Sequence, residues 1–215
     1  MRDISPEPPP NCDICPRLAQ FRADTAADHP DWFNGAVPSF GPENAQLLIV
    51  GLAPGLQGAN KTGRPFTGDY AGDLLYATLE DFGFTKGRYD ARADDGLQLV
   101  NAMITNAVRC VPPQNKPTGP EANACRPFLI ARIAALPRLK AILALGKIAH
   151  DAVIKAAGER LSDYHFAHGA QHDLPAGHAL FDSYHCSRYN TNTGRLTPAM
   201  FADVFQAARD YLSDA

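Results

Sequence analysis

The feature that most constrains this chain is the stretch of residues 46–69, QLLIVGLAPGLQGANKTGRPFTGD. Its apolar run, residues 47–50, stops abruptly at Gly51, which is typical of a buried parallel strand that ends in a loop. Ligands of open α/β sheets bind beyond the carboxyl ends of strands, so this glycine-rich loop is a candidate binding site. A tight strand-to-helix turn without a ligand is the alternative. Phe66, between Gly63 and Gly68, belongs either to the core or against a flat ligand.

The rest of the chain alternates strands with helices. Thr118 and Glu121 form a capping box, and Thr197-Pro198 begins a last helix. This order predicts a three-layer α/β/α domain with a mainly parallel four-stranded sheet, and a single domain over residues 1–215. The predicted strands are 47–50, 97–108, 139–145 and 179–183, and the predicted helices are 16–23, 70–82, 118–135, 147–157 and 198–212.

Composition excludes some classes of protein. The chain has 215 residues and a formal net charge of −3, so nucleic-acid binding would have to depend on a local basic patch. No apolar run is long enough for a membrane span, and the chain opens on no signal-peptide pattern. We therefore expect a cytoplasmic, intracellular protein without a membrane partner. In such a reducing compartment, cysteines are more often ligands or free thiols than disulfides.

The cysteines suggest a metal centre. Cys12 and Cys15 form a CxxC pair near the proline-rich amino end, Cys110 ends the second strand and Cys125 lies on the next helix. A zinc ribbon would show two tight pairs, whereas fourteen residues separate the second pair here. Iron–sulfur clusters accept such scattered thiolates. Free buried cysteines are the alternative for Cys110 and Cys125.

Polar residues follow two further strands. The segment DSYHCSRYNTNTGRLTP places His185 directly after one strand, and Asn106 ends another. Because Gly51 stands at an equivalent strand end, these loops are expected to face one pocket. An aromatic ring, an amide and an imidazole together suit the edge and face of a purine or pyrimidine base.

Together, GLAPG, GRPFTGD, NAVRCVPP and SYHCSRYNTNTGRLT resemble the iron–sulfur uracil-DNA glycosylases, and among them the broad-specificity family-5 group. The resemblance covers nearly the whole chain. It implies the uracil-glycosylase fold, and a [4Fe–4S] cluster on Cys12, Cys15, Cys110 and Cys125, with the cluster-binding amino-terminal segment at about residues 1–30. It also implies a monofunctional DNA repair enzyme that removes uracil, and other deaminated bases such as hypoxanthine, from DNA.

The resemblance also implies roles for individual residues. Leu52 replaces a polar residue that handles water in related families, which points to the family-5 group, where Asp69 is the water-handling carboxylate. Phe66 would stack on the flipped base, Asn106 would read its edge and His185 would donate to its carbonyl oxygen. Gly51, Leu52 and Asn190 complete the expected base site. The residues expected to contact DNA are Lys61, Arg64, Arg188 and Tyr189. Phosphate contacts are expected from the basic residues, and solvated surface is the equal alternative for each of them: Lys61, Arg64, Lys116, Arg188 and Arg195.

Two positions depart from the family pattern: Cys186 stands where proline is common, and Tyr189 replaces a more usual glutamine.

Several alternatives stay open. Asp69 would also serve as a helix N-cap before Tyr70, and it can do both jobs. Besides the monofunctional glycosylase, a second hypothesis is a glycosylase with lyase activity through Lys61, which we do not expect. The third hypothesis is a catalytically weak iron–sulfur nucleic-acid-binding protein. We expect a monomer.

Overall fold

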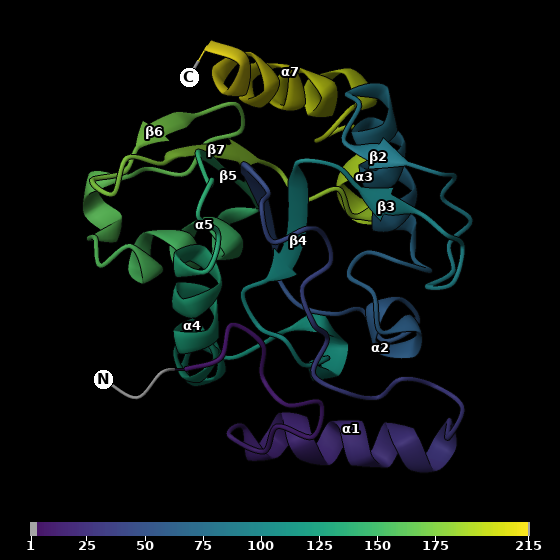
Figure 1. The fold of residues 1–215 in the computed structure, drawn as a ribbon. Helices are drawn as coiled ribbons and strands as arrows, with labels where there is room; N and C mark the ends of the chain where they lie inside the picture. Colours follow the sequence, from purple (N-terminus) through teal and green to yellow (C-terminus); the bar gives the residue numbers. More distant parts are fainter. Residues whose placement is uncertain (1–3, 215) are drawn as a thin grey trace.

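A computed structural model describes residues 4–214, so the first residues of the expected amino-terminal segment at about 1–30 lie outside the described residues. Its main sheet has five strands in the order β4-β1-β5-β7-β6 (Figure 1). The strands are β1 Leu47–Gly51, β4 Ala102–Asn106, β5 Ala141–Leu145, β6 Gln171–Asp173 and β7 Ala179–Ser183. The β1, β4, β5 and β7 strands pair in parallel, while β6 pairs antiparallel with β7. The expected three layers are confirmed, but the expected four strands are wrong by one.

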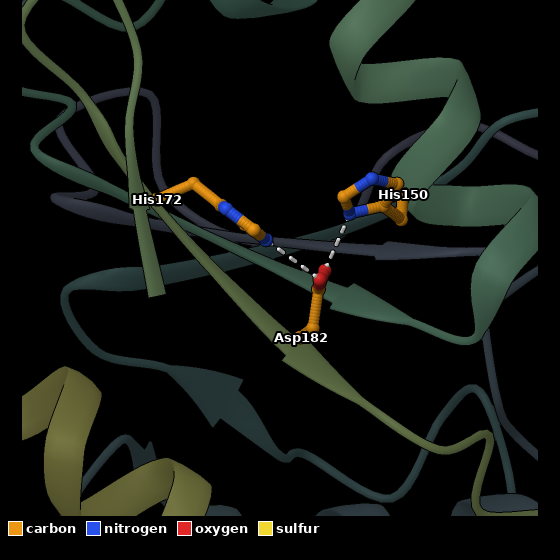
Figure 2. Close-up of side chains that lie close together, drawn as sticks. All are labelled: His150, His172 and Asp182. Atoms are coloured by element: carbon orange, nitrogen blue, oxygen red, sulfur yellow. Dashed lines mark hydrogen bonds and ion pairs between the residues drawn. The ribbon is translucent and has the colours of Figure 1, made fainter. Parts of the chain in front are cut away.

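Helices cover both faces of the sheet. Successive side chains of a strand point to opposite faces, and every residue of the four parallel strands is buried, so both faces need a covering layer. On one face, side chains such as Ile49 and Phe181 pack against α3 (Tyr70–Asp81) and α7 (Pro198–Asp214). On the other face, Leu48 and Leu180 pack against α4 (Gly119–Ala134) and α5 (Lys147–Ala156). This second face also holds a polar cluster of the buried His150 and Asp182 with the partly buried His172 (Figure 2).

The helix starts follow the predicted capping residues. Thr118 and Glu121 form the expected capping box at the start of α4, and Asp69 caps α3 by accepting a hydrogen bond from the Gly72 amide. Gly146 precedes α5 with φ of +96°, a conformation that favours glycine.

Other boundaries differ from the prediction. The strand expected over residues 97–108 is broken at Asn101, whose φ of +57° interrupts extended backbone. It becomes β3 (Gln98–Leu99), which pairs with β2 (Thr85–Lys86) in a small second sheet, and then β4. The first helix, α1 (Pro16–Asp28), is longer than expected. The short helices α2 (Ala59–Thr62) and α6 (Arg188–Asn192) were not predicted.

The amino-terminal segment and α1 lie beside the end of β4 and the start of α4 (Figure 1). Leu18 of α1 packs there with Val108 and Phe128, in a third apolar cluster separate from the two faces of the sheet. Among residues 4–214, no helix is long and apolar enough to span a membrane.

Candidate active site

A cavity of about 370 Å³ opens at the carboxyl ends of the parallel strands. Gly51 and Asn106 are register partners at the ends of β1 and β4, and His185 follows β7. The structure therefore brings together the three strand ends that the sequence predicted would converge. The residues that line the cavity include Leu52, Pro54, Phe66, Asp69, Asn106, Asn115, His185 and Arg188.

Two polar atoms at this cavity are buried without a partner. Asn106 Oδ1 and His185 Nδ1 have no hydrogen-bond partner among the described residues, although both atoms are shielded from solvent. A buried polar group without a partner is costly, which makes such atoms candidates for contacts with a ligand. Burial also lowers the pKa of His185 to about 4, so the imidazole is neutral at physiological pH and offers one N–H donor.

Phe66 forms an apolar wall of the same cavity. Its φ of +53° is unusual for a bulky residue, and such strain is found mainly at functional sites. The ring is 7% exposed, and its centroid lies 6.0 Å from that of the His185 ring. A Cβ atom added to Gly51 would lie 2.6 Å from the Phe66 ring and 2.4 Å from Asn106 Oδ1. Gly51 is therefore required for the ring and the amide to approach β1 as they do.

Asp69 combines a structural contact with a place at the cavity. Its Oδ1 accepts the Gly72 N–H at 3.1 Å, which makes it the N-cap of α3. Its Oδ2 lies against Gly55 and Gly58, where an added Cβ would stand 2.9 Å and 2.4 Å away. A carboxylate has about four acceptor sites, so the cap leaves lone pairs for a water molecule. Burial raises the pKa of Asp69 above its ordinary value.

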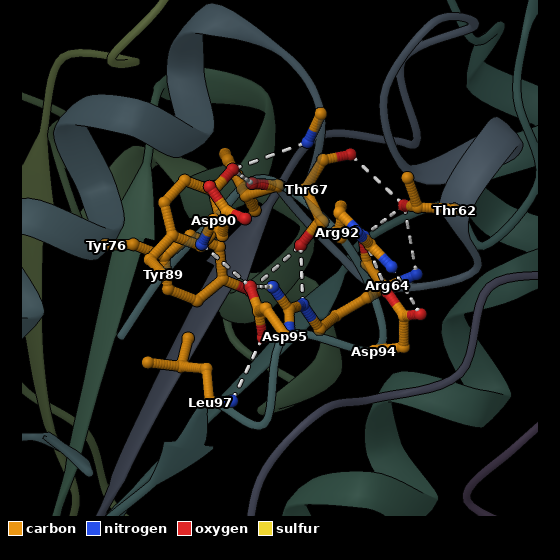
Figure 3. A network of polar contacts seen from close by, with 12 residues as sticks. Thr62, Arg64, Thr67, Tyr76, Tyr89, Asp90, Arg92, Asp94, Asp95 and Leu97 are labelled. Carbon is orange, nitrogen blue, oxygen red and sulfur yellow. Dashed lines mark hydrogen bonds and ion pairs between the residues drawn. The ribbon is translucent and has the colours of Figure 1, made fainter. Parts of the chain in front are cut away.

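Arg64 holds the loop that runs from Phe66 to Asp69, and its guanidinium is not free to contact DNA. Figure 3 shows Arg64 with its partners Asp95 and Thr67. The Arg64 guanidinium donates to both oxygens of Asp95 at 2.7 Å, and its Nε donates to Thr67 Oγ1 at 2.7 Å. Arg64 is only 5% exposed, and its guanidinium also lies over the rings of Phe40, Tyr76 and Tyr89. The expectation that Arg64 contacts DNA phosphate is therefore wrong; it positions the loop that carries Phe66 and Asp69.

Asn190 does not line the cavity itself but contacts His185, which does. Its Nδ2 donates to the His185 carbonyl at 2.8 Å, and its side chain faces a neighbouring pocket lined by Gly146 and Arg195. This contact fixes the backbone of His185 without placing the amide in the base site. The structure thus assigns Asn190 a positioning contact in place of the expected contact with the base.

The remaining basic and aromatic candidates are at the surface. Arg188 lines the mouth of the cavity and its guanidinium lies 5.2 Å from the Tyr70 ring centroid. Tyr189 is 72% exposed. Lys61 lies over Trp32 and lines a separate groove, while Lys116 and Arg195 are exposed elsewhere. These positions are compatible with contacts to DNA, but only Arg188 reaches the cavity itself.

The four cysteines of the predicted metal centre line one small cavity, although they come from α4 and from two separate loop segments, the one before α1 and the one after β4. Cys12 and Cys15 are partly exposed, whereas Cys110 and Cys125 are buried. The Arg109 amide donates to Cys125 Sγ at 3.4 Å. Burial raises the pKa of Cys110 to about 12 and that of Cys125 to about 11, so neither is a thiolate at neutral pH unless a metal ligates it. The free-thiol alternative does not explain why all four gather at one place.

Comparison with known proteins identifies the family. The family model for the uracil DNA glycosylase superfamily matches residues 38–209 of this chain. A type-5 uracil-DNA glycosylase of Thermus thermophilus is 43% identical over 204 residues, which cover 92% of each chain. The chain belongs to the type-5 uracil-DNA glycosylases. A second member, from Mycobacterium leprae, is 44% identical over 92% of this chain and 90% of its own length.

This membership agrees with the resemblance seen in the sequence. The crystal structure of wild-type Pedobacter heparinus SMUG2 matches the fold with a TM-score of 0.50 and 14% identity, over 80% of this chain and 77% of that one. It supports the shared architecture alone. A type-4 uracil-DNA glycosylase of Pyrobaculum aerophilum is 36% identical over 70% of this type-5 chain and 63% of its own length.

Sequence reasoning missed some residues of the site. Asn115 lines the cavity from the proline-rich loop after Cys110, where Gln114 and Asn115 both have positive φ angles. The proline-rich sequence indicated only a loop, because its return to the cavity depends on tertiary packing. The link from Arg64 to Asp95 spans 31 positions of the chain, and no local pattern announces it.

Proposed function

We propose that this type-5 family member hydrolyses the N-glycosidic bond of uracil in DNA and leaves an abasic site. The observation that carries the proposal is the cavity at the strand ends, where unpartnered Asn106 Oδ1 and His185 Nδ1 meet the Phe66 ring beside Asp69. Enzymes that act on a DNA base extrude it into a pocket and recognise it by stacking and by hydrogen bonds to its edge. The type-5 relatives in Thermus and Mycobacterium are named for this activity.

Binding uses the apolar and polar walls of the cavity together. The Phe66 ring offers a face for the extruded base, and the Asn106 amide pairs with an acceptor and a donor on the base edge. The buried imidazole of His185 is neutral, so its N–H donates to a base carbonyl without placing a buried positive charge.

Bond cleavage then needs stabilisation of two developing charges. The C1′–N bond breaks with its electron pair on the base, which becomes anionic, while the sugar becomes oxocarbenium-like. The His185 N–H and backbone N–H groups of the glycine-rich loop are donors for the anionic base, and preorganised donors of this kind supply large stabilisation. The Asp69 carboxylate orients the water that adds to C1′ and offsets the positive sugar.

Breadth of substrate follows from Leu52. Because Leu52 gives the cavity an apolar wall, no polar group at that wall is left unpaired by the wrong base, and discrimination is weak. Asn106 can rotate its amide to match the imide edge of uracil or the lactam edge of hypoxanthine. We therefore propose that hypoxanthine is a second substrate.

The four clustered cysteines are proposed to hold a [4Fe–4S] cluster, the group for which their spacing and common cavity are suited. The Arg109 N–H directed at Cys125 Sγ is typical of the hydrogen bonds that surround such sulfurs. Bound there, the cluster supplies cross-links, not chemistry at the base. Its ligands fasten the amino-terminal segment to the loop after β4 and to α4.

Contacts with DNA are proposed for the surface around the mouth of the cavity, with Arg188 and Tyr189 on α6 nearest to it and Lys61 further along. Lys61 lines another groove, so it is not placed to attack an abasic sugar, and we propose a monofunctional glycosylase.

The test is excision from duplex and single-stranded oligonucleotides that carry one uracil or one hypoxanthine, followed by alkali cleavage. We expect fastest removal of uracil from mismatched or single-stranded DNA, where extrusion costs least, and measurable removal of hypoxanthine. Asn106→Ala should reduce both activities, because both bases use the same contact. Binding without any excision would leave the weak nucleic-acid-binding alternative, and excision of uracil alone would show a tighter pocket than Leu52 suggests.

A further inference from the structure

Three side chains of metal-ligating types lie together on the face of β7 that is opposite to α7. Asp182 of β7 and His172 of β6 share the sheet face that α5 covers, and His150 reaches them from α5 (Figure 2). Asp182 Oδ1 lies 2.8 Å from His150 Nδ1, and Asp182 Oδ2 lies 3.2 Å from His172 Nε2. One ligand atom from each of the three residues lies within 4.8 Å of the other two.

These three side chains lie in the protein interior and are not a surface ion pair. The Asp182 and His150 side chains are 0% and 1% exposed, while His172 at 16% keeps one side open to solvent. His150 Nε2 lies 3.0 Å from the Tyr164 carbonyl. A metal-ligating histidine usually donates its other ring N–H to a backbone carbonyl or a carboxylate, which fixes the tautomer. The Tyr164 carbonyl therefore accepts the Nε2–H. Nδ1 donates its own N–H to the Asp182 carboxylate when no metal is present, and a metal would displace that proton.

Aromatic neighbours hold both imidazoles in place. The Phe166 ring meets His150 edge to face at 5.7 Å between centroids, and the Tyr164 ring meets His172 at 5.8 Å. The orientation of the ligands is thus determined by packing as well as by hydrogen bonds, which reduces the cost of ordering them around an ion.

We propose that His150 Nδ1, His172 Nε2 and one oxygen of Asp182 bind a single divalent transition-metal cation of the Zn²⁺ type. Two imidazoles and a carboxylate suit Zn²⁺, and a water from the open side of His172 completes four ligands. Ligand atoms about 2.0–2.1 Å from a tetrahedral ion lie about 3.4 Å apart. The observed separations of 2.8 and 3.2 Å involve different oxygens of Asp182, and one ligand atom from each residue lies within 4.8 Å of the others. Binding through a single oxygen therefore needs a shift of the carboxylate and the rings within this range.

The site is separate from the glycosylase cavity and from the cysteines, so its role is structural. It would tie the short edge strand β6, which has three residues, to β7 and α5. Asp182 precedes His185 by three residues on the strand that leads into the base site. A metal here would brace that strand without touching the base.

The test is calorimetric titration of the purified full-length protein with Zn²⁺, in parallel with two variants. His172→Gln keeps a donor for Asp182 but removes the ligand nitrogen. The matched control is His165→Ala, at an exposed histidine in the loop that precedes β6. We expect one Zn²⁺ per chain for the wild type and for His165→Ala, and an affinity at least about a hundredfold lower for His172→Gln, in keeping with loss of a metal ligand. Far-UV circular dichroism checks that the variant is folded; Asp182→Asn serves in its place if it is not.

X-ray absorption at the zinc edge then identifies the ligands. We expect nitrogen and oxygen scatterers at about 2.0–2.1 Å and no sulfur at about 2.3 Å. A sulfur shell would place the ion at the cysteines and overturn the proposal. Equal Zn²⁺ binding by the wild type and His172→Gln, or no binding by the wild type, would show that the three residues form only an ion pair.

Discussion

Replacing Asp69 with asparagine separates its structural contact from its proposed catalytic one. Asparagine and aspartate are equally good N-caps, and the Asn Oδ1 can still accept the Gly72 N–H that Asp69 accepts at 3.1 Å. The lost charge removes about 0.3–1 kcal/mol of interaction with the helix dipole. It also removes the burial cost that raises the pKa of this carboxyl, so the two changes oppose each other. We expect the free energy of unfolding of Asp69→Asn to stay within about 1 kcal/mol of wild type.

The effect on excision should be much larger. Loss of a positioned acid–base group costs about a hundredfold to ten-thousandfold in rate, or about 2.7–5.4 kcal/mol in the barrier. The assay is single-turnover excision from a uracil-containing duplex with enzyme in excess, so that binding and product release do not limit the rate. Asp73→Asn, an exposed acidic residue in the first turn of the same helix, is the matched control and should retain wild-type rates.

The pH dependence gives a second, independent readout. Because burial raises the pKa of Asp69, the wild-type rate should fall on the acid side at a pH above the ordinary carboxyl range. The Asp69→Asn variant should lack this decline, since its amide does not titrate. A loss of less than about tenfold in the single-turnover rate, with the acid decline retained, would show that Asp69 is only a helix cap and that the water is held elsewhere.

Three further predictions test the surrounding structure. Gly51→Ala should lower the single-turnover excision rate about a hundredfold, because its Cβ would overlap the Phe66 ring and the Asn106 amide; an unchanged rate would mean that neither group needs its present position. Cys125→Ser should lose iron and the absorption of the cluster near 400 nm and unfold at lower temperature, whereas Cys186→Ser, at a buried cysteine outside the cluster, should retain both; a colourless, zinc-loaded, active wild type would contradict the cluster. Burial lowers the pKa of His185 to about 4 in the folded state, against about 6.5 in the unfolded state, so the unfolded state binds more protons between these values. The free energy of unfolding should therefore fall as the pH drops through this window. Denaturant titrations should show a smaller fall for His185→Asn, and an equal fall would refute the lowered pKa of His185.

The sequence predicted most of the parallel core because its signals are local. The apolar run that ends at Gly51 and the capping box at Thr118 each lie within a few residues, and the structure confirms the strand and the helix there. The strand over residues 179–183 was predicted with its observed bounds. The extra strand β6 was missed, since a three-residue segment with the sequence QHD has no strand-forming pattern of its own.

The candidate site was predicted less completely, for a physical reason. Asn106 ends β4 and His185 follows β7, so sheet topology brings these two residues to one edge. Phe66 and Asp69 flank glycines, but the loop that carries them reaches this edge through the contacts of Arg64. The role of Arg64 depends instead on Asp95, a partner distant in the chain, and only the folded structure shows that the guanidinium is buried. An arginine beside a glycine-rich loop is therefore not by itself evidence of a phosphate contact.

The central claim is that the cavity at the strand ends removes uracil by hydrolysis. The measurement that tests it most directly is mass spectrometry of both products after incubation of the purified protein with an oligonucleotide that contains one uracil. We predict free uracil and an intact strand that carries one abasic site, with neither product formed by Asp69→Asn on the same time scale. An unchanged oligonucleotide at excess wild-type enzyme, or a cleaved strand without released base, would contradict the account.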